Sequence, residues 1–221
     1  MAVSGTTLGK RPPLQSRSRE KADRILAAAE RLFSERGFEH AHLEDMAREA
    51  GCSVGTCYQR FGSKEALLGI IRDRFCEEAR QRIDQLVPLA IKTQPQMADI
   101  LRGVVLTVVS NMRTRTGMFR ALAQRALVDP EVWRPMQELG DYFAEEMQKV
   151  LVPRAAEFGR EDLNTGFRMG MQTIYGALLH TLLVPKYMAI PLEDDRIIEE
   201  LRVLFAACMR LKEDKAVSNA R

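Results

Sequence analysis

The chain has 221 residues, 46% of them hydrophobic, and carries 33 Lys and Arg against 30 Asp and Glu. This length and apolar fraction suit one compact domain or two small ones and exclude a chain that is disordered throughout. A net charge of +3 is too small to indicate a nucleic-acid partner by itself. The positive excess is nevertheless localised, because residues 1–21 hold five basic side chains and one acidic side chain.

The first twenty residues are predicted to be a flexible basic arm. They contain Gly9, Pro12, Pro13 and several serines but few large apolar side chains, so burial cannot offset the entropy lost on ordering. Arg17 and Arg19 in this arm, and Lys21 directly after it, are candidate DNA contacts.

Helical spacing of apolar residues is sustained along most of the remaining chain, which predicts an all-α fold. The first predicted helix starts at Arg24 and stops at Gly37. A short helix follows from Leu43 to Ala50, another starts at Ser53, and a long one runs from Ser63 to Leu86, before a linker bounded by Pro88 and Pro95. Later helices are expected at residues 97–113, 117–128, 131–151, 161–184 and 194–212, separated by Gly and Pro signals.

Residues 43–61 read LEDMAREAGCSVGTCYQRF. This pattern of two short helices joined by a tight turn is typical of a helix-turn-helix. Gly51 can adopt the left-handed conformation that ends the first helix, and the Ser53 hydroxyl can cap the second. Val54, Cys57 and Phe61 are three and four residues apart, so they are expected to face the core.

The opposite face of the second helix is expected to contact DNA. Gln59 can read adenine, Arg60 can reach guanine or phosphate, and the Thr56 methyl suits thymine. Gly55 allows close approach of the backbone to the duplex. The candidate DNA-binding residues of this segment are Ser53, Gly55, Thr56, Tyr58, Gln59 and Arg60, with Lys64 after it. The alternative for so short a match is an ordinary helical corner with a solvated face.

The wider stretch from Ile25 to Leu68 resembles the DNA-binding domain of the tetracycline-repressor-like (TetR) family. The matching elements are Ala28-Ala29 with Leu32-Phe33, Gly37-Phe38, Met46-Ala47, Ala50-Gly51, Ser53, Gly55-Thr56, Tyr58, Phe61 and Ser63-Lys64-Glu65. The resemblance covers about a fifth of the chain, and beyond Leu68 only the general helical plan agrees.

This resemblance implies an all-helical homodimer whose third helix, Ser53 to Phe61, enters the major groove of operator DNA while Lys64 contacts the backbone. The chain departs from the family at His42, where a hydroxyl cap is frequent, and at Cys57 and Arg60. The resulting domain expectation is a basic arm at 1–20, a three-helix helix-turn-helix DNA-binding domain at 21–68, a helical ligand-binding and dimerisation domain at 69–213, and a tail at 214–221.

The four cysteines, Cys52, Cys57, Cys76 and Cys208, match neither zinc-site nor disulfide-framework spacings, so free thiols in a reducing compartment are expected. Redox sensing by Cys52 and Cys57 is the alternative to a role as small core residues. The histidines lack metal-site spacing, and no metal is expected. No apolar run approaches the roughly 18 residues of a membrane span, and no secretory signal is recognisable, so a cytoplasmic protein without a membrane partner is predicted.

The C-terminal half lacks recognisable catalytic motifs, so neither an enzyme nor a cofactor is expected. Its Met and aromatic residues are mostly core, yet such side chains also line pockets for apolar effectors. Candidate ligand-binding residues are Met112, Phe119, Met136, Tyr142, Phe143, Met147, Phe167, Met171, Tyr175 and His180.

The last two predicted helices carry apolar stripes that are expected to pair with a second chain. The stripes comprise Leu163, Phe167, Ile174, Leu178 and Leu182 in one helix and Ile197, Leu201, Leu204, Phe205 and Cys208 in the other. Burial of both stripes within one chain is the alternative.

The predicted function is a sequence-specific DNA-binding transcriptional regulator, a repressor that a small, mainly apolar effector releases from double-stranded operator DNA. The alternative is a helical ligand-binding or adaptor protein whose helix-turn-helix no longer binds DNA. An intact basic arm, Gly55, Tyr58 and Lys64 favour the regulator.

Overall fold

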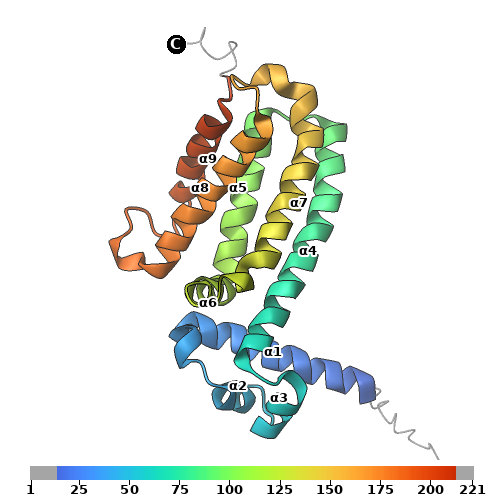
Figure 1. The fold of residues 1–221 in the computed structure, drawn as a ribbon, viewed down its shortest axis with the longest axis vertical. Coiled ribbons are helices and arrows are strands. Elements are labelled where there is room, and N and C mark those ends of the chain that lie inside the picture. The colour runs from blue at the N-terminus through green and yellow to red at the C-terminus, as the bar shows by residue number, and fades with distance from the viewer. Residues whose placement is uncertain (1–13, 213–221) are drawn as a thin grey trace, which may run out of the picture.

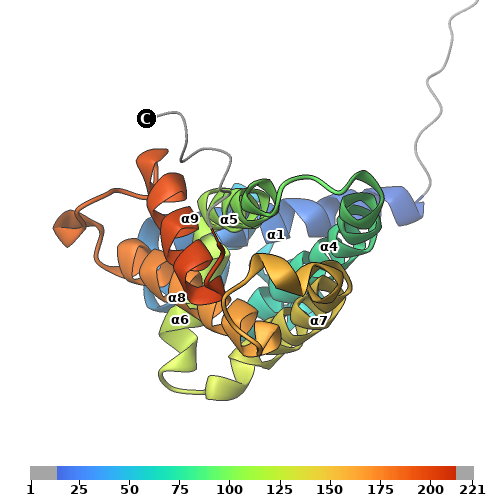
Figure 2. The same ribbon diagram turned by 90° about the horizontal axis from the view of Figure 1, so that it is seen from above.

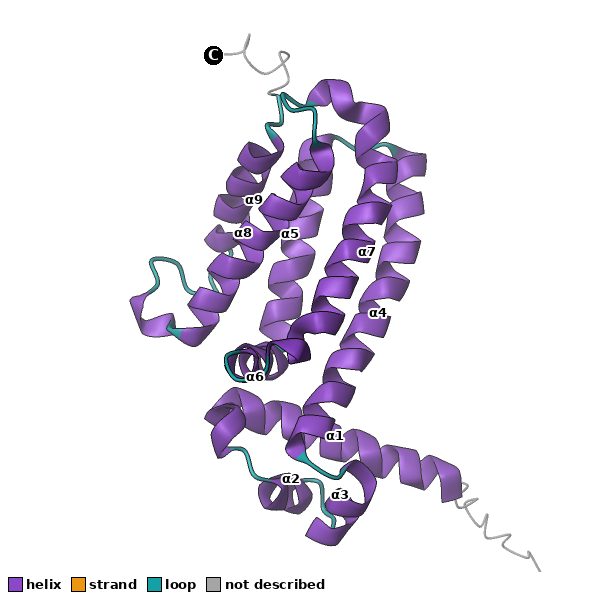
Figure 3. Ribbon diagram, in the orientation of Figure 1, coloured by secondary structure: helices purple, strands orange, loops and turns teal. Residues whose placement is uncertain are grey.

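A computed structural model describes residues 14–212 of the chain, and within that range every regular element is a helix (Figures 1 and 3). The α-helices are α1 (Leu14–His40), α2 (Leu43–Glu49), α3 (Val54–Phe61), α4 (Lys64–Thr93), α5 (Met97–Thr114), α6 (Thr116–Ala126), α7 (Arg134–Leu151), α8 (Leu163–Leu183) and α9 (Arg196–Met209). Three short 3₁₀ helices are η1 (Pro130–Trp133), η2 (Val152–Glu157) and η3 (Pro185–Tyr187). The all-α expectation is therefore confirmed.

The helices form two layers joined by α4 (Figure 1). Helices α1, α2 and α3 form a small layer at one end, and α5, α7, α8 and α9 form a bundle with the rest of α4. Seen from above, the bundle helices are grouped around a common axis (Figure 2). Helix α6 lies across the end of the bundle that is nearest to α1, and it packs against α1. It therefore lies between the two layers.

Buried aromatic rings hold both layers together. Phe33 stacks on Phe38 with ring centroids 5.4 Å apart, inside the small layer. Phe75 of α4 meets Phe119 of α6 edge to face at 5.4 Å, and both rings are at most 2% exposed. Such pairs add to the free energy gained from apolar burial. The core is thus continuous from the small layer through α6 into the bundle.

Two expected helix boundaries are wrong. Helix α1 begins at Leu14, so Arg17 and Arg19 lie in a helix and not in a flexible arm, and Lys21 lies in the same helix. The residues from Leu14 to Lys21 include several good helix formers. From Ala22 onward α1 is held by packing against the core. Extending an existing helix by further turns avoids the cost of nucleating a new one. Residues 1–13 and the tail at 214–221 lie outside the described residues.

The second wrong boundary is the end of the long helix. Helix α4 continues through Pro88 to Thr93, where Gln94 ends it in a left-handed conformation with φ 44°. A proline removes one backbone hydrogen bond, but Val87 beside it is 4% exposed, and its packing favours the helical path. The predicted break at Gly37 is confirmed, because that residue has φ 75° and ψ 171° inside α1.

The contact between α1 and α6 requires a glycine. A Cβ atom at Gly117 would lie 2.0 Å from the carbonyl oxygen of Glu30 and 2.8 Å from the backbone nitrogen of Ser34. Backbone atoms cannot rotate out of the way as a side chain can. Only a residue without a side chain therefore lets α6 approach α1 so closely.

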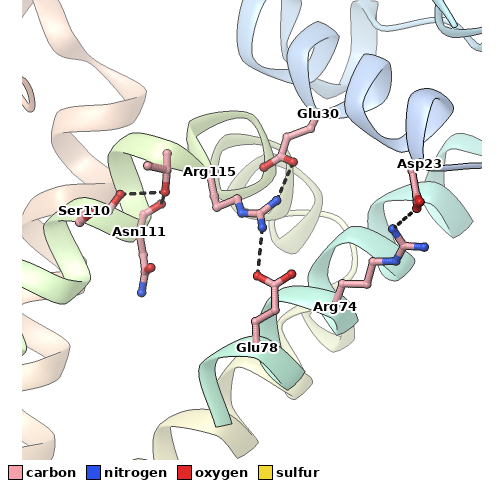
Figure 4. Close-up of polar contacts among 8 residues, drawn as sticks. Asp23, Glu30, Arg74, Glu78, Ser110, Asn111 and Arg115 are labelled. Carbon is pink, nitrogen blue, oxygen red and sulfur yellow. Dashed lines mark hydrogen bonds and ion pairs between the residues drawn. The ribbon is translucent and has the colours of Figure 1, made fainter. Parts of the chain in front are cut away.

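Polar contacts surround this close approach. Arg115, at the turn between α5 and α6, pairs with Glu30 of α1 and Glu78 of α4, each at 3.0 Å, and Arg74 pairs with Asp23 at 2.8 Å (Figure 4). The Arg115 guanidinium thus joins three segments at one point.

Arg120 and Gln124 of α6 bind backbone groups of the first helix. Arg120 donates hydrogen bonds to the carbonyl oxygens of Ser34 at 2.5 Å and of Leu182 at 3.3 Å. The Gln124 side chain accepts one from the backbone nitrogen of Phe38 at 2.8 Å. Helix α6 therefore connects the end of α1 to the end of α8.

We expect Gly117→Ala to lower the free energy of unfolding by about 1–3 kcal/mol, because the methyl group forces α6 away from α1. Gly103→Ala on α5 is the matched control, since a Cβ atom there meets nothing within 4 Å and should stabilise the helix by about 0.5–1 kcal/mol. Urea unfolding of both variants measures the difference. Equal stability of the two variants would contradict the close contact.

Candidate functional site

Helices α2 and α3 form the expected helix-turn-helix. Gly51 has φ 66°, the left-handed conformation predicted for it, and the Cys52 backbone nitrogen donates to the Ala47 carbonyl at 2.9 Å. The Ser53 hydroxyl accepts a hydrogen bond from the Thr56 backbone nitrogen at 3.2 Å. His42 makes no side-chain cap at the start of α2. The predicted local chemistry of this turn is confirmed.

Helix α3 has one face packed against the core and one face exposed, as predicted. Cys57 is fully buried, while Val54 and Phe61 are half-buried and pack against the core. The expected DNA-facing residues Ser53, Gly55, Tyr58, Gln59 and Arg60 are exposed, and Thr56 is half-buried. Their outward orientation agrees with the prediction, and their contact with DNA stays a prediction.

Arg60 lies against the first helix. Its guanidinium donates to the Ser18 hydroxyl at 2.9 Å and lies 5.9 Å from the centroid of the Phe61 ring. The N-terminal part of α1 therefore lies beside α3, close enough for both to face one ligand.

Arg19 has acidic neighbours. It lines a hollow of about 690 Å³ between α1 and α4 that also contains Asp23, Asp73, Glu77 and Glu78. Arg74 lines the same hollow and pairs with Asp23 at 2.8 Å. The contact of Arg19 with DNA remains a prediction.

Lys64 contacts backbone carbonyls of the small layer. Its ammonium donates to the carbonyl oxygens of Phe38 at 2.9 Å and Glu39 at 3.2 Å and lies 4.5 Å from the Phe38 ring centroid. A lysine has three N–H donors, so one remains for a phosphate. The structure therefore gives Lys64 a structural role that the sequence did not predict, and its phosphate contact stays a prediction.

A cavity of about 490 Å³ opens between α7 and α8. Four of the ten predicted ligand-binding residues line it: Met136, Phe167, Met171 and Tyr175. Its remaining lining residues are Trp133, Gln137, Gly140, Asp141, Ala144, Arg168, Gln172, Gly176 and Leu179. The sequence signal for this space is the set of small residues that face each other across the two helices.

The other six predicted ligand residues lie elsewhere. Met112, Phe119 and Met147 are core side chains at most 3% exposed, and His180 is exposed. The Tyr142 hydroxyl bonds to Asp84 on α4. Phe143 packs edge to face on Phe167 at 5.3 Å. Composition could not separate core from cavity lining, because both require the same apolar residues.

The cavity combines an apolar wall with a few polar groups. Burial raises the pKa of the Tyr175 phenol to about 12, so this hydroxyl is neutral at physiological pH. Asp141 and Arg168 form an ion pair with side chains 44% and 39% exposed, which places the pair at the solvent edge. Such a site suits a mainly apolar molecule oriented by one or two hydrogen bonds.

The expected dimer stripes are largely wrong, because packing between helices of the same chain buries them. Eight of the ten residues are at most 6% exposed, and Phe205 fits against Gly170, where a Cβ atom would lie 2.1 Å from its ring. Only Leu204 is exposed, at 47%, and Cys208 is half-buried. The apolar residues that α8 and α9 do expose are Met169, Leu183, Val203 and Leu204.

Across residues 14–212, every helix is too short or too polar to span a lipid bilayer. In the same range, no three His, Cys, Asp or Glu side chains gather as a metal site would require.

Comparison with known proteins identifies the helix-turn-helix. The family model described as "Bacterial regulatory proteins, tetR family" matches residues 25–69. An uncharacterized HTH-type transcriptional regulator of Mycobacterium tuberculosis is 34% identical over 92 residues, which cover 42% of this chain and 44% of the relative. The match thus spans less than half of that relative's length.

Solved structures resemble the fold over most of the chain. A transcriptional regulator from Saccharomonospora viridis, in complex with choline, has a TM-score of 0.70 at 18% identity and covers 88% of this chain and 100% of its own. Thermus thermophilus FadR, in complex with lauroyl-CoA, has a TM-score of 0.56 at 21% identity, covering 88% and 97%. Residues 25–69 therefore match the TetR family of bacterial regulatory proteins, and the fold of the described residues is similar to that of these solved regulators.

Proposed function

We propose that the protein is a sequence-specific transcriptional regulator in the cytoplasm that binds double-stranded operator DNA as a homodimer through α3. The observation that carries this proposal is the exposed polar face of α3, where Gln59 and Arg60 point outward. The Ser53 hydroxyl caps this helix, and Cys57 on its other face is buried. A helix of this size fits the major groove, where amide and guanidinium groups distinguish base pairs. As a repressor, it would leave DNA when an effector binds.

The alternative is an adaptor or ligand-binding protein that no longer binds DNA. Such a protein has no need for an exposed Tyr58, a bare backbone at Gly55 or a free amide at Gln59. The DNA-binding proposal explains all three features, so we favour it.

We expect Gln59→Ala to reduce affinity for the DNA flanking its own gene by about tenfold, because one base-reading contact is lost. Affinity for unrelated DNA should stay unchanged, since phosphate contacts remain. Gln85→Ala is the matched control, because Gln85 is also an exposed glutamine but lies on α4 and not on α3. Fluorescence anisotropy measures both affinities. Failure of the wild-type chain to prefer its flanking DNA would favour the adaptor.

The homodimer proposal uses the exposed face of α8 and α9, not the buried stripes. Met169 and Leu183 are each 47% exposed on α8, and Val203 and Leu204 are 52% and 47% exposed on α9. Large apolar side chains exposed on two helices that pack against each other are candidates for an interface. Pairing of both helices across a two-fold axis would set the two copies of α3 about 34 Å apart or more, the spacing of one DNA turn.

We expect Leu204→Glu to convert the dimer to a monomer at micromolar concentration, because two carboxylates would face each other across the two-fold axis. Leu89→Glu on α4 is the control, since Leu89 is 52% exposed and far along the chain from α8 and α9. Sedimentation velocity distinguishes the outcomes. A wild-type monomer, or a dimer in the Leu204→Glu variant, would contradict this interface.

The effector is proposed to bind in the cavity between α7 and α8. Choline and lauroyl-CoA occupy the two solved relatives named above, and this cavity has its own apolar lining. We expect a small, mainly apolar molecule that accepts a hydrogen bond from the neutral Tyr175 hydroxyl.

Coupling to DNA would pass through α8 and α6. The cavity is lined by α8, whose Leu182 carbonyl shares Arg120 with the Ser34 carbonyl of α1. A ligand that binds more tightly to one position of α8 would therefore also favour one position of α1 and of α3, which contacts α1. A difference of about 1–3 kcal/mol between the two states is ordinary for such a switch.

We expect Gly140→Leu to abolish effector binding, because its side chain fills the cavity that Gly140 lines. A Cβ atom there meets nothing within 4 Å, so the fold should persist. Gly103→Leu, also unobstructed but outside the cavity, is the control. Compounds found by thermal shift should lower the DNA affinity of wild type and Gly103→Leu but not of Gly140→Leu. Compounds that bind yet leave wild-type DNA affinity unchanged would refute the coupling.

A further inference from the structure

Two cysteine thiols meet inside the helix-turn-helix. The Sγ atoms of Cys52, in the turn, and Cys57, on α3, are 3.7 Å apart, which is van der Waals contact between sulfur atoms. Cys52 is half-buried, while Cys57 is fully buried. Cys76 and Cys208 are free thiols in other parts of the fold. The pair therefore combines one reachable thiol with a second thiol at reacting distance.

We propose that Cys52 and Cys57 form a reversible disulfide in exchange with a small-molecule disulfide, and that closure of this bond lowers DNA affinity. The second clause rests on the proposed function, whereas the first does not. A disulfide of this kind would be transient in a reducing compartment, as redox-sensing disulfides are.

The exchange is balanced without any other oxidant. The Cys52 thiolate attacks one sulfur of the small disulfide and forms a mixed disulfide on Cys52 Sγ, while the S–S bond of the small disulfide breaks and releases one small thiolate, which takes up a proton from water. The Cys57 sulfur then attacks Cys52 Sγ, and the mixed disulfide breaks and releases the second small thiol, which takes up the Cys57 proton. Two protein thiols are oxidised by two electrons, and the small disulfide is reduced to two thiols.

Burial determines the order of these steps. Burial, together with the hydrogen bond with Cys52, raises the pKa of the Cys57 thiol to about 11. A protonated, buried thiol is a poor first nucleophile. Cys52 therefore reacts first, and Cys57 completes the disulfide because the mixed disulfide places a sulfur electrophile beside it.

Closure would act on the segment that carries the DNA-facing residues. A disulfide holds its sulfur atoms at about 2.05 Å, so the two must approach by about 1.6 Å from their separation of 3.7 Å. The Ser53 cap, Gly55 and Thr56 lie between the two cysteines in sequence. The new bond would draw the turn and α3 together across this segment, and binding groups tolerate displacements of only about 0.5 Å.

The experiment treats the reduced full-length protein with glutathione disulfide at graded ratios to glutathione. Trypsin cleavage after Arg48 and Arg60 places Cys52 and Cys57 in one peptide, residues 49–60. After alkylation of free thiols, we expect this peptide to carry no alkyl group and to lack two hydrogens. DNA affinity should fall by about tenfold or more, as for a lost base contact, and dithiothreitol should restore it.

Three variants sharpen the test. Cys57→Ala removes the buried thiol without adding a polar group and should trap glutathione on Cys52. Cys52→Ser should prevent closure and make DNA affinity insensitive to glutathione disulfide. Cys208→Ser is the matched control and should behave as wild type, with circular dichroism confirming helical content in every case.

Several results would overturn the proposal. Alkylation of both cysteines at every ratio, or a stable glutathione adduct on wild-type Cys52, would rule out the disulfide. Closure with unchanged DNA affinity would rule out the switch. If the reduced protein binds no DNA, the proposed function and its switch fail together, while the peptide mass still decides whether the disulfide forms.

Discussion

Helix α6 lies against α1 at a contact that only a glycine at position 117 permits, and this contact determines how the two layers meet. It lets Arg115, Arg120 and Gln124 reach backbone or carboxylate groups of α1, and so joins the helix-turn-helix layer to the bundle without a flexible linker. The Arg120 guanidinium also binds the end of α8, which lines the cavity. These contacts are the route by which we propose that a movement of the bundle reaches α1, and Arg60 of α3 contacts Ser18 of that helix.

The helix-turn-helix was predictable because its determinants are local. The left-handed conformation at Gly51, the Ser53 cap and the core position of Cys57 each follow from residue type and spacing within a few residues. Burial and hydrogen bonds agree with all three. The role of Lys64 was not predictable, because its carbonyl partners Phe38 and Glu39 are distant in sequence and belong to another helix.

The C-terminal half was predicted less well because its surfaces depend on which helices pack together. Apolar periodicity located α8 and α9 but could not show that their stripes face each other, with Phe205 against Gly170. The dimer face that we propose therefore uses the exposed apolar residues of both helices and not these stripes. In the same way, Met112 and Met136 are alike in sequence, yet only Met136 lines the cavity, because the small residues Gly140 and Ala144 leave space beside it.

Amide hydrogen exchange of the full chain, with and without DNA flanking its own gene, tests the central claim that α3 is the DNA-contacting helix joined to the bundle through α6. The account predicts added protection in residues 53–61 and in the neighbouring first turns of α1. It predicts no direct protection in η1 or the middle of α7, which lie in the opposite layer (Figure 1). Protection absent from residues 53–61, or concentrated on α7, would contradict it.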